Sequence, residues 1–561
     1  MPEFPKRTHA LDSPLSRGRL TVQLLLVLAA CASVQGWLVA HARTISRDGV
    51  GYLKVARACT DGVACAAQAS PLHVGYPATL AAARWAMVRA GGSSGRDGWE
   101  LAGQLVSLLA ALGAAAALWA LAGLTLGWRV AWTAPLLFGV TKRWAAEGAD
   151  VVTEPLAILA ATVAAAAAVA VSLRLRRAPD RRVRPGTLAL AALAGLGVGA
   201  GYLVRPEMLL VGPLAAGLWL FGLLAPPRRW RSALACVAVM AAAALACALP
   251  YMITIGGLTN KHDWQELLSH AASGSSPLLA IGSLGFLGTN RFGGIPGVLI
   301  AKFTEAIHPV LGAALLIWLV TYVGARLPRP RLPAGILRTP RWQLGFLVVG
   351  WAVLFVPFLV GRAEQLDRLS ARYLFFQAVL AVPFAAAGVW TLAAWLRVLA
   401  GRLKWPAWIR RHALPLVALP MAVVLAWDAL EPLHASWVHY RRAGEHLAAT
   451  AGPDERVVVT DVLVLHYAER RGPRVVAGNF TSERLALWSM QGDWLVITEK
   501  DMEKFEPRPR TGWLAGIFSP PVFEEVAAFP QPGKKRDPDV ARVYRIHHAA
   551  LRERLAERRA R

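Results

Sequence analysis

Asp48 is a carboxylate that directly follows the first hydrophobic stretch of the chain, in the segment Ser46-Arg47-Asp48-Gly49-Val50-Gly51-Tyr52. A charged side chain beside an apolar region is costly unless it is paired or used, so we treat Asp48 as a functional candidate. A carboxylate in this position could act as a general base and take a proton from a hydroxyl group. The alternative is an interfacial residue that Arg47 or water satisfies.

Two arginines, like Asp48, lie beside hydrophobic stretches. They suit the binding of a phosphate group, because a guanidinium group can contact phosphate through two hydrogen bonds. Arg372 opens a late hydrophobic stretch, and Arg205 lies between two earlier ones. For Arg372 the alternative is a side chain that only extends to the membrane surface. For Arg205 the alternative is a local pair with Glu207.

The composition places these residues in a membrane protein. Of the 561 residues, 55% are hydrophobic and 17% are charged, and the mean hydropathy is +0.42, as expected of a chain that crosses a membrane many times. The formal net charge is +26. The sequence has no basic stripe interleaved with aromatic residues on a soluble domain, so we predict no nucleic-acid partner.

The hydrophobic pattern predicts a polytopic α-helical protein with eleven transmembrane helices. They lie near residues 20–41, 101–126, 130–146, 152–173, 187–204, 208–225, 232–255, 297–323, 344–361, 373–396 and 413–430. With residues 1–19 in the cytoplasm, Lys and Arg are roughly three times denser in the cytoplasmic segments than in the external loops, as the positive-inside rule requires. The C-terminus is then external. We expect residues 71–90 to lie along the outer membrane surface. The alternative is one more crossing, which would place the tail inside.

The composition of residues 431–561 predicts a small extracytoplasmic α/β domain with a basic tail. Runs typical of strands occur at 457–460, 474–477, 494–498 and 541–546, separated by helical or Gly- and Pro-containing stretches. The domain carries no phosphate-binding glycine loop and no metal-ligand pattern, so we expect a structural or acceptor-recognising role.

Two further expectations concern the external loop 42–100. Cys59 and Cys65 are spaced so that a disulfide can form in an oxidising compartment. His73 has no second His or Cys at ligand spacing, so we expect a surface histidine and no metal site.

The order of motifs resembles that of the GT-C superfamily of integral membrane glycosyltransferases, in particular family 39, which includes protein O-mannosyltransferases and lipid A aminoarabinose transferases. The resemblance extends over most of residues 20–430, although the usual Pro-Pro-Leu-Tyr-Pro order is broken by His73-Val74-Gly75. The segments that carry it are Ser46–Leu53, Pro71–Pro77, Arg143–Glu147 with Thr153–Leu156, and Arg372–Leu374.

This resemblance implies transfer of a sugar from a polyprenyl-phosphate donor to an acceptor hydroxyl, with inversion at the anomeric carbon. It implies Asp48 as the base, Arg372 and Arg205 as ligands of the donor phosphate, and contacts to the sugar or acceptor from Glu154, Glu207, Tyr52 and Tyr76. The partners would be the lipid-linked donor, a lipid, glycan or protein acceptor, and the lipids of the cell inner membrane. The sequence identifies no cofactor, and a divalent cation stays an open alternative.

Other interpretations use the same pattern. A transporter or flippase of lipid-linked saccharides would use a charged cavity for passage, and a receptor whose tail senses a ligand is supported by the tail alone. Glu154 precedes Pro155 at an expected helix start, so helix capping is the alternative to a substrate contact there.

Overall fold

The computed structural model describes residues 16–177, 183–221, 230–261, 265, 294–324, 341–360, 370–470, 472–474, 482–498, 500–502, 521–532 and 539–560. The chain forms two compact units. The helical unit comprises the chain up to Ala40 together with Tyr52–Glu431, and the C-terminal unit comprises His41–Gly51 together with Pro432–Arg561. The short segment 41–51 therefore belongs with the C-terminal unit.

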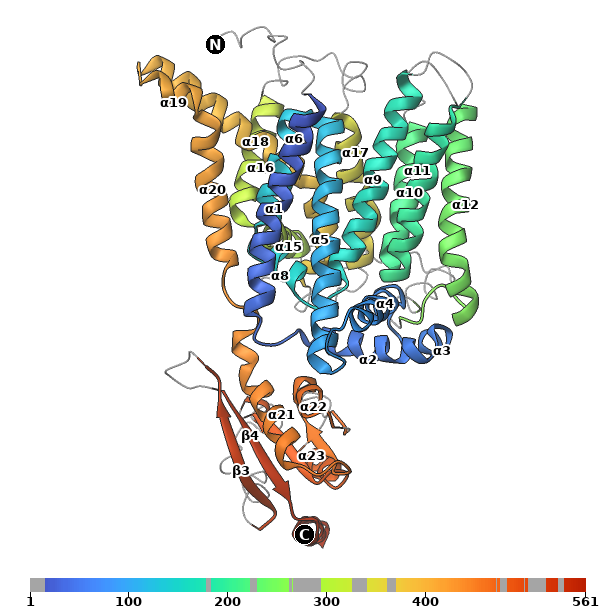
Figure 1. Ribbon diagram of the computed structural model, residues 1–561, viewed down its shortest axis with the longest axis vertical. Helices are drawn as coiled ribbons and strands as arrows, with labels where there is room; N and C mark the ends of the chain where they lie inside the picture. The colour runs from blue at the N-terminus through green and yellow to red at the C-terminus, as the bar shows by residue number, and fades with distance from the viewer. Residues whose placement is uncertain are drawn as a thin grey trace. The chain divides into compact units, whose positions relative to one another are not determined.

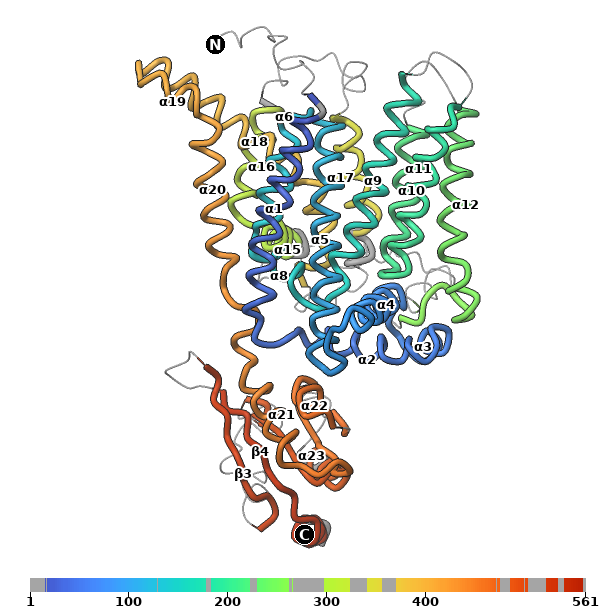
Figure 2. Tube along the Cα trace, in the orientation of Figure 1, coloured from blue at the N-terminus to red at the C-terminus, as the bar shows by residue number. Residues whose placement is uncertain are grey.

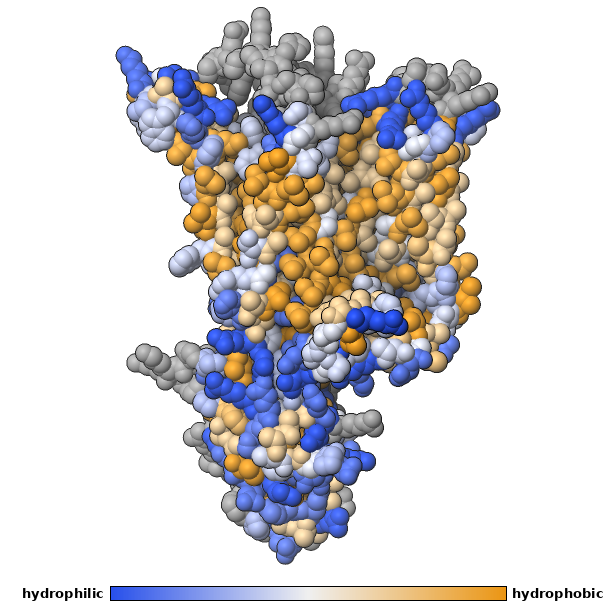
Figure 3. Space-filling model, viewed as in Figure 1, coloured by the Kyte–Doolittle hydropathy of each residue, from blue (hydrophilic) through white to orange (hydrophobic). Residues whose placement is uncertain are grey.

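Long apolar helices dominate the helical unit (Figure 1). Within the described ranges, six helical segments are long and apolar enough to cross a membrane, or seven if a bent pair counts as one span, so the number eleven is not confirmed. The six are α1 (Arg17–His41), α5 (Arg96–Leu126), α9 (Glu154–Arg177), α10 (Pro185–Val204), α12 (Trp230–Ile255) and the segment Ala371–Arg402, formed by η5 (Ala371–Leu374) and α18 (Phe375–Arg402). Hydrophobic side chains form a broad band over the visible face of these helices (Figure 3).

The remaining predicted spans, except 130–146, also coincide with helices. They are α11 (Val211–Phe221), which follows η2 (Pro206–Leu210), α17 (Arg341–Val360) and α20 (Ala413–Ala429), together with the bent pair α15 (Gly294–Ile307) and α16 (Pro309–Gly324). The pair bends by 109° where His308 adopts a positive φ of 77°.

The predicted span at 130–146 is wrong. Three short helices replace it, α6 (Trp128–Ala131), α7 (Thr133–Gly139) and α8 (Lys142–Ala149). Pro135 lies within α7 and supplies no backbone N–H for the helical pattern. Thr141 then adopts an extended conformation, with φ −70° and ψ 140°, and its hydroxyl donates to the carbonyl of Phe138 at 2.8 Å. Hydropathy alone does not detect these interruptions.

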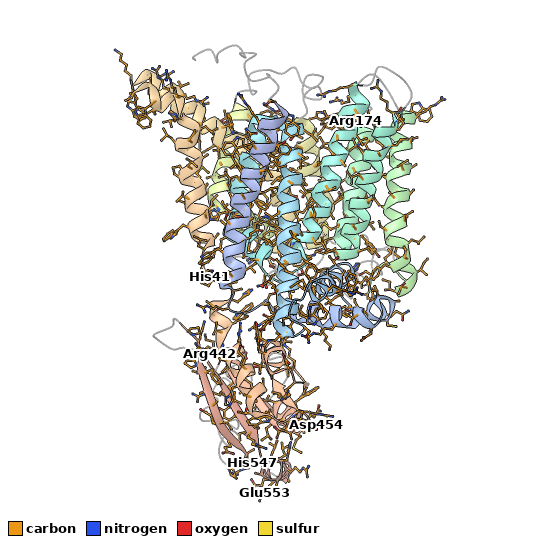
Figure 4. The ribbon with its side chains drawn as sticks, viewed as in Figure 1. His41, Arg174, Arg442, Asp454, His547 and Glu553 are labelled. Carbon is orange, nitrogen blue, oxygen red and sulfur yellow. The ribbon has the colours of Figure 1, made fainter. Side chains whose placement is uncertain are left out.

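Small residues allow the long helices to approach closely. A Cβ atom on Gly197 of α10 would lie 2.7 Å from the carbonyl oxygen of Ala160 in α9, and one on Gly195 would lie 2.1 Å from that of Met240 in α12. Arg174, labelled in Figure 4 near the end of α9, donates from Nη1 to the carbonyl oxygen of Gly186 in α10 at 2.7 Å. The three helices α9, α10 and α12 therefore form one closely packed layer.

Two short helices of the helical unit, α3 (Val63–Ala69) and α4 (Gly75–Arg89), run across the ends of the long ones (Figure 2). They follow α2 (Arg47–Asp61), whose buried Cys59 packs in an apolar cluster with Tyr202 and Tyr251. The predicted disulfide is wrong, because Cys59 and Cys65 are both free. Cys59 lies in α2 and Cys65 lies in α3, so both cysteines are in helices. Cys65 is exposed, whereas Cys59 is buried.

The C-terminal unit contains a four-stranded sheet in the order β1-β2-β4-β3. Its strands are β1 (Val457–Val459), β2 (Trp494–Thr498), β3 (Phe523–Pro530) and β4 (Val540–Ile546), with β1 parallel to β2 and the other pairs antiparallel. Helices α21 (Val438–Thr450), α22 (Val462–Ala468), α23 (Ser482–Ser489) and α26 (His548–Ala560) complete the unit. Figure 4 labels Arg442, Asp454, His547 and Glu553 within it.

This sheet confirms the predicted strands at 457–460, 494–498 and 541–546 to within a residue. Of the predicted strand 474–477, Arg474 forms an isolated bridge to Val459, and residues 475–477 lie outside the described ranges. Strand β3 was not predicted, because a register shift between Glu525 and Ala527 breaks the alternation that identifies a strand.

We predict that Gly388→Ala destabilises the helical unit. A Cβ atom there would lie 1.9 Å from the carbonyl oxygen of Ala314, so α16 and α18 would have to separate. Overpacking of this kind costs about 1–3 kcal/mol, which thermal unfolding of the purified protein in detergent would detect. Gly401→Ala on the same helix is the control, because its Cβ atom would meet nothing within 4 Å. Equal melting temperatures for the two variants would contradict the close approach.

Candidate active site

A buried cluster of charges forms where α9 begins and α10 ends. Arg205 donates from Nη1 to Glu154 Oε1 at 2.8 Å, and its Nε lies 2.7 Å from Glu207 Oε1. The three side chains are between 3% and 10% exposed. Local sequence explains the placement, because Pro155 favours the helix start just after Glu154 and Pro206 favours the turn just after Arg205. One guanidinium group thus compensates two buried carboxylates.

Arg372 joins the same cluster from η5. Its Nε lies 4.0 Å from Glu154 Oε1, and its side chain is 34% exposed. The ring of Tyr373 lies 5.8 Å from the Arg372 guanidinium carbon and 5.9 Å from that of Arg205, which is within reach of a cation–π interaction with both. Arg372 is therefore the more accessible of the two cations.

A narrow cavity of about 20 Å³ adjoins the cluster. The charged groups and Tyr373 form one side of it, and Met208, Phe355, Phe375 and Phe376 form the apolar side. The site is closed around its own ion pairs in this structure, so a ligand as large as a sugar phosphate requires the side chains to move.

Two tyrosines connect the cluster to α2 and α4. The hydroxyl group of Tyr52 lies 3.4 Å from Thr153 Oγ1, which in turn lies 3.4 Å from Glu154 Oε2. Tyr76 packs against Tyr52 with the rings 5.4 Å apart, and its own hydroxyl donates to the carbonyl of Gly103 at 3.3 Å. Tyr52 thus adjoins the cluster, whereas Tyr76 is fully buried behind it.

Two further acidic residues, Glu147 and Asp150, lie near the start of α9. Glu147 forms an ion pair with Arg143, with Oε1 3.3 Å from Nε. Asp150 is buried and accepts from the backbone N–H of Val151 at 2.7 Å. Lys142 pairs instead with Glu431, 2.6 Å away, and with Asp428. The acidic environment of Glu154 is therefore larger than its motif indicated.

His73 is not the surface residue that we predicted, because its side chain is only 2% exposed. Its Nδ1 lies 2.8 Å from the carbonyl oxygen of Tyr202 and its Nε2 lies 2.8 Å from Thr259 Oγ1. Burial, helped by the charge of Lys261, lowers the pKa of His73 to about 4. His73 is therefore a neutral connector between the end of α10 and the segment after α12. Within the described ranges no group of three His, Cys, Asp or Glu side chains could hold a metal ion.

Asp48 lies in the first turn of α2 and is exposed. Ser46 fixes the start of this helix, because its Oγ accepts from the backbone N–H of Gly49 at 3.0 Å. The preceding Arg47 forms an ion pair with Asp461. Asp48 and Arg47 belong to the C-terminal unit, while Glu154, Glu207, Arg205 and Arg372 lie together in the helical unit. Of the predicted site residues, the structure thus brings together these four, with Tyr52 beside them.

Protein-family models give no match to this chain, and no curated protein matches its sequence. Solved structures nevertheless share its architecture of long apolar helices with a C-terminal domain. The chain has the fold of the GT-C membrane glycosyltransferases, which confirms the fold that the motifs indicated.

Two solved structures illustrate this likeness. One is the archaeal oligosaccharyltransferase AglB from Archaeoglobus fulgidus in complex with an inhibitory peptide and a dolichol-phosphate, with a TM-score of 0.56 and 11% identity over 84% of this chain and 69% of that chain. The other is ArnT from Cupriavidus metallidurans bound to undecaprenyl phosphate, with a TM-score of 0.50 and 14% identity over 94% of this chain and 98% of that chain.

We predict that Arg205→Met destabilises the protein by about 3–5 kcal/mol, because Glu154 and Glu207 would be left buried without their shared cation. The yield of folded protein after detergent extraction and its melting temperature measure this effect. Lys302→Met is the control, since Lys302 forms an exposed pair with Glu305, which is worth at most about 1 kcal/mol. A normal melting temperature for Arg205→Met would show that the two carboxylates do not need this cation.

Proposed function

We propose that this chain is a glycosyltransferase that moves a sugar from a polyprenyl-phosphate donor to an acceptor hydroxyl group. The observation that carries the proposal is the buried cluster of Glu154, Arg205, Glu207 and Arg372 at the ends of long apolar helices. A cationic group beside carboxylates at such a position suits a ligand that is both a phosphate and a polyol. The shared fold with ArnT, solved bound to undecaprenyl phosphate, supports the same donor class.

In the proposed reaction, Asp48 takes the proton of the acceptor hydroxyl group while the oxygen of that hydroxyl group attacks the anomeric carbon of the donor sugar. The bond from that carbon to the donor phosphate breaks, and the polyprenyl phosphate leaves from the opposite face, so the configuration inverts. Asp48 lies in the first turn of α2 and is exposed. Its support as the base is its place in the segment Ser46–Leu53, one of the segments that resemble the GT-C glycosyltransferases.

Two arginines take different roles in this proposal: Arg372 binds the donor phosphate, and Arg205 positions other side chains. Arg372 is the proposed contact to the leaving phosphate, because it is the more exposed arginine and its ion-pair distance to Glu154 is long. Arg205 is already held by two carboxylates, so we assign it the orientation of Glu154 and Glu207 toward sugar or acceptor hydroxyl groups.

We place the reaction on the extracytoplasmic side of the cell inner membrane, with the C-terminal unit on that side. The support is the density of Lys and Arg between the hydrophobic stretches, which favours cytoplasmic positions for the segments around 174–186 and 397–412. Which sugar and which acceptor bind depends on the shape that the site takes when its side chains move to admit them.

Asp48→Asn should abolish transfer while leaving expression and membrane insertion near wild type. Asn is almost the same size but cannot accept the proton, and loss of a general base typically costs about 10²–10⁴ in rate. The measurement is release of polyprenyl phosphate from proteoliposomes that contain a panel of polyprenyl-phosphate monosaccharides and cell-envelope acceptors. Asp61→Asn, an exposed acid at the other end of α2, is the control.

Two outcomes of this assay would reject the proposal. Wild-type turnover by inserted Asp48→Asn protein would remove the base from the mechanism. Movement of the labelled sugar across the bilayer without release of polyprenyl phosphate by the wild type would identify a transporter.

Arg372→Ala should raise the KM for the donor by roughly tenfold to a hundredfold, because a hydrogen bond to a charged group contributes about 1.5–3 kcal/mol. High donor concentration should restore much of the rate if the lost contact acts in ground-state binding. Arg372→Lys keeps the charge without the two-pronged contact and should give an intermediate KM. An unchanged KM in Arg372→Ala would exclude this residue as the phosphate ligand.

A further inference from the structure

The C-terminal unit contains a second, larger cavity of about 310 Å³, within the range of small-molecule sites. Arg47 from the segment 41–51 lines it, as do His439 of α21, Thr460 after β1 and Asp539 before β4. Backbone contacts tie the segment 41–51 to this unit, because the N–H of Arg43 donates to the carbonyl of Leu433 at 3.3 Å. The cavity is therefore assembled from several separate stretches of the chain.

The buried polar atoms of this cavity that have no hydrogen-bond partner among the described residues include Nε2 of His439 and Oγ1 of Thr460. The two residues are 2% and 9% exposed. A buried polar atom without a partner typically costs about 1–3 kcal/mol, so such atoms are rare in native proteins. Their position in the lining indicates that a bound molecule completes their hydrogen bonds.

The charges of the cavity indicate the chemistry of that molecule. Asp461 is neutralised by the ion pair with Arg47, and its Oδ1 accepts from the backbone N–H of Leu463 at 3.0 Å. Asp539 is 9% exposed and accepts from the backbone N–H of Lys500 at 3.4 Å. Within the described ranges no Lys or Arg side chain pairs with Asp539, and its nearest cationic candidate is His439, whose Nε2 lies 4.0 Å away.

His439 does not supply the missing positive charge at neutral pH. Burial lowers the pKa of this histidine and outweighs the opposing effect of Asp539 and Asp461. A third carboxylate, Asp501, also lines the cavity and is buried. Arg474 and Lys500 line the cavity as well, but both residues are exposed. A buried carboxylate next to hydroxyl and imidazole groups suits a ligand that brings a cation and hydrogen-bond donors.

We propose that this cavity binds a small hydroxylated amine, of the class of amino sugars and amino alcohols, with its ammonium group at Asp539 and its hydroxyl groups at Thr460 and His439. The ammonium group supplies the counter-charge, and the hydroxyl groups satisfy the two unpartnered atoms. This site is separate from the cluster around Arg205, since all of its lining residues belong to the C-terminal unit.

The test is calorimetric titration of the full-length protein in detergent with glucosamine and with glucose at pH 7. We expect glucosamine to bind at least tenfold more tightly than glucose, since a hydrogen bond to a charged group contributes about 1.5–3 kcal/mol. Asp539→Asn should remove this preference, and Thr460→Val should weaken binding of glucosamine severalfold. The readout involves no sugar transfer, so its result is independent of the proposed function.

Asp454→Asn is the matched control, an exposed acid of the same unit that does not line the cavity. Melting temperatures of the variants show whether each remains folded, and Thr460→Val, which leaves Asp539 in place, still tests the site if Asp539→Asn unfolds. Absence of glucosamine binding by the wild type overturns the proposal. Equal affinity for glucose and glucosamine, or unchanged glucosamine affinity in folded Asp539→Asn or Thr460→Val protein, also overturns it.

Discussion

Arg205 must stay between Glu154 and Glu207, because two carboxylates cannot remain buried beside apolar helices without a cation. This requirement fixes the start of α9 against the turn from α10 to η2, and Arg372 of η5 reaches the same cluster, with its Nε 4.0 Å from Glu154 Oε1. Arg205 is therefore held at the centre of the cluster, and Arg372 lies at its more exposed edge. A polar ligand that enters from this edge meets Arg372 before it meets Arg205.

The architecture of the helical unit was largely predictable because hydropathy responds to the same property that places a helix in a membrane. The failure at 130–146 has a local cause. Pro135 and the extended Thr141 interrupt the backbone hydrogen bonds of a stretch whose composition is mostly apolar. In the C-terminal unit, β3 was missed for a similar reason, because its register shift and exposed face remove the regular alternation of apolar residues.

The candidate site was predictable only where its partners are close in sequence or share a motif. The pair of Arg205 and Glu207 could be proposed from their spacing, whereas the stronger constraint on Glu154 joins residues 51 positions apart. His73 shows the opposite problem. Its sequence neighbours give no sign that it is buried between Tyr202 and Thr259, because those partners come from α10 and from the segment after α12. Motifs identify residue types, but only the fold identifies which of them share a buried volume.

The segment 41–51 has a consequence for how this protein can be divided. Arg43, Ile45 and Arg47 all contact the C-terminal unit, through the carbonyl of Leu433, the hydroxyl of Tyr467 and the carboxylate of Asp461. A recombinant fragment that begins at residue 432 would lack this strip and would leave Asp461 buried without its guanidinium group. A faithful soluble version needs the eleven residues supplied as a fused or added peptide. For the same reason, exchange of C-terminal domains between homologous proteins would have to exchange this early strip as well.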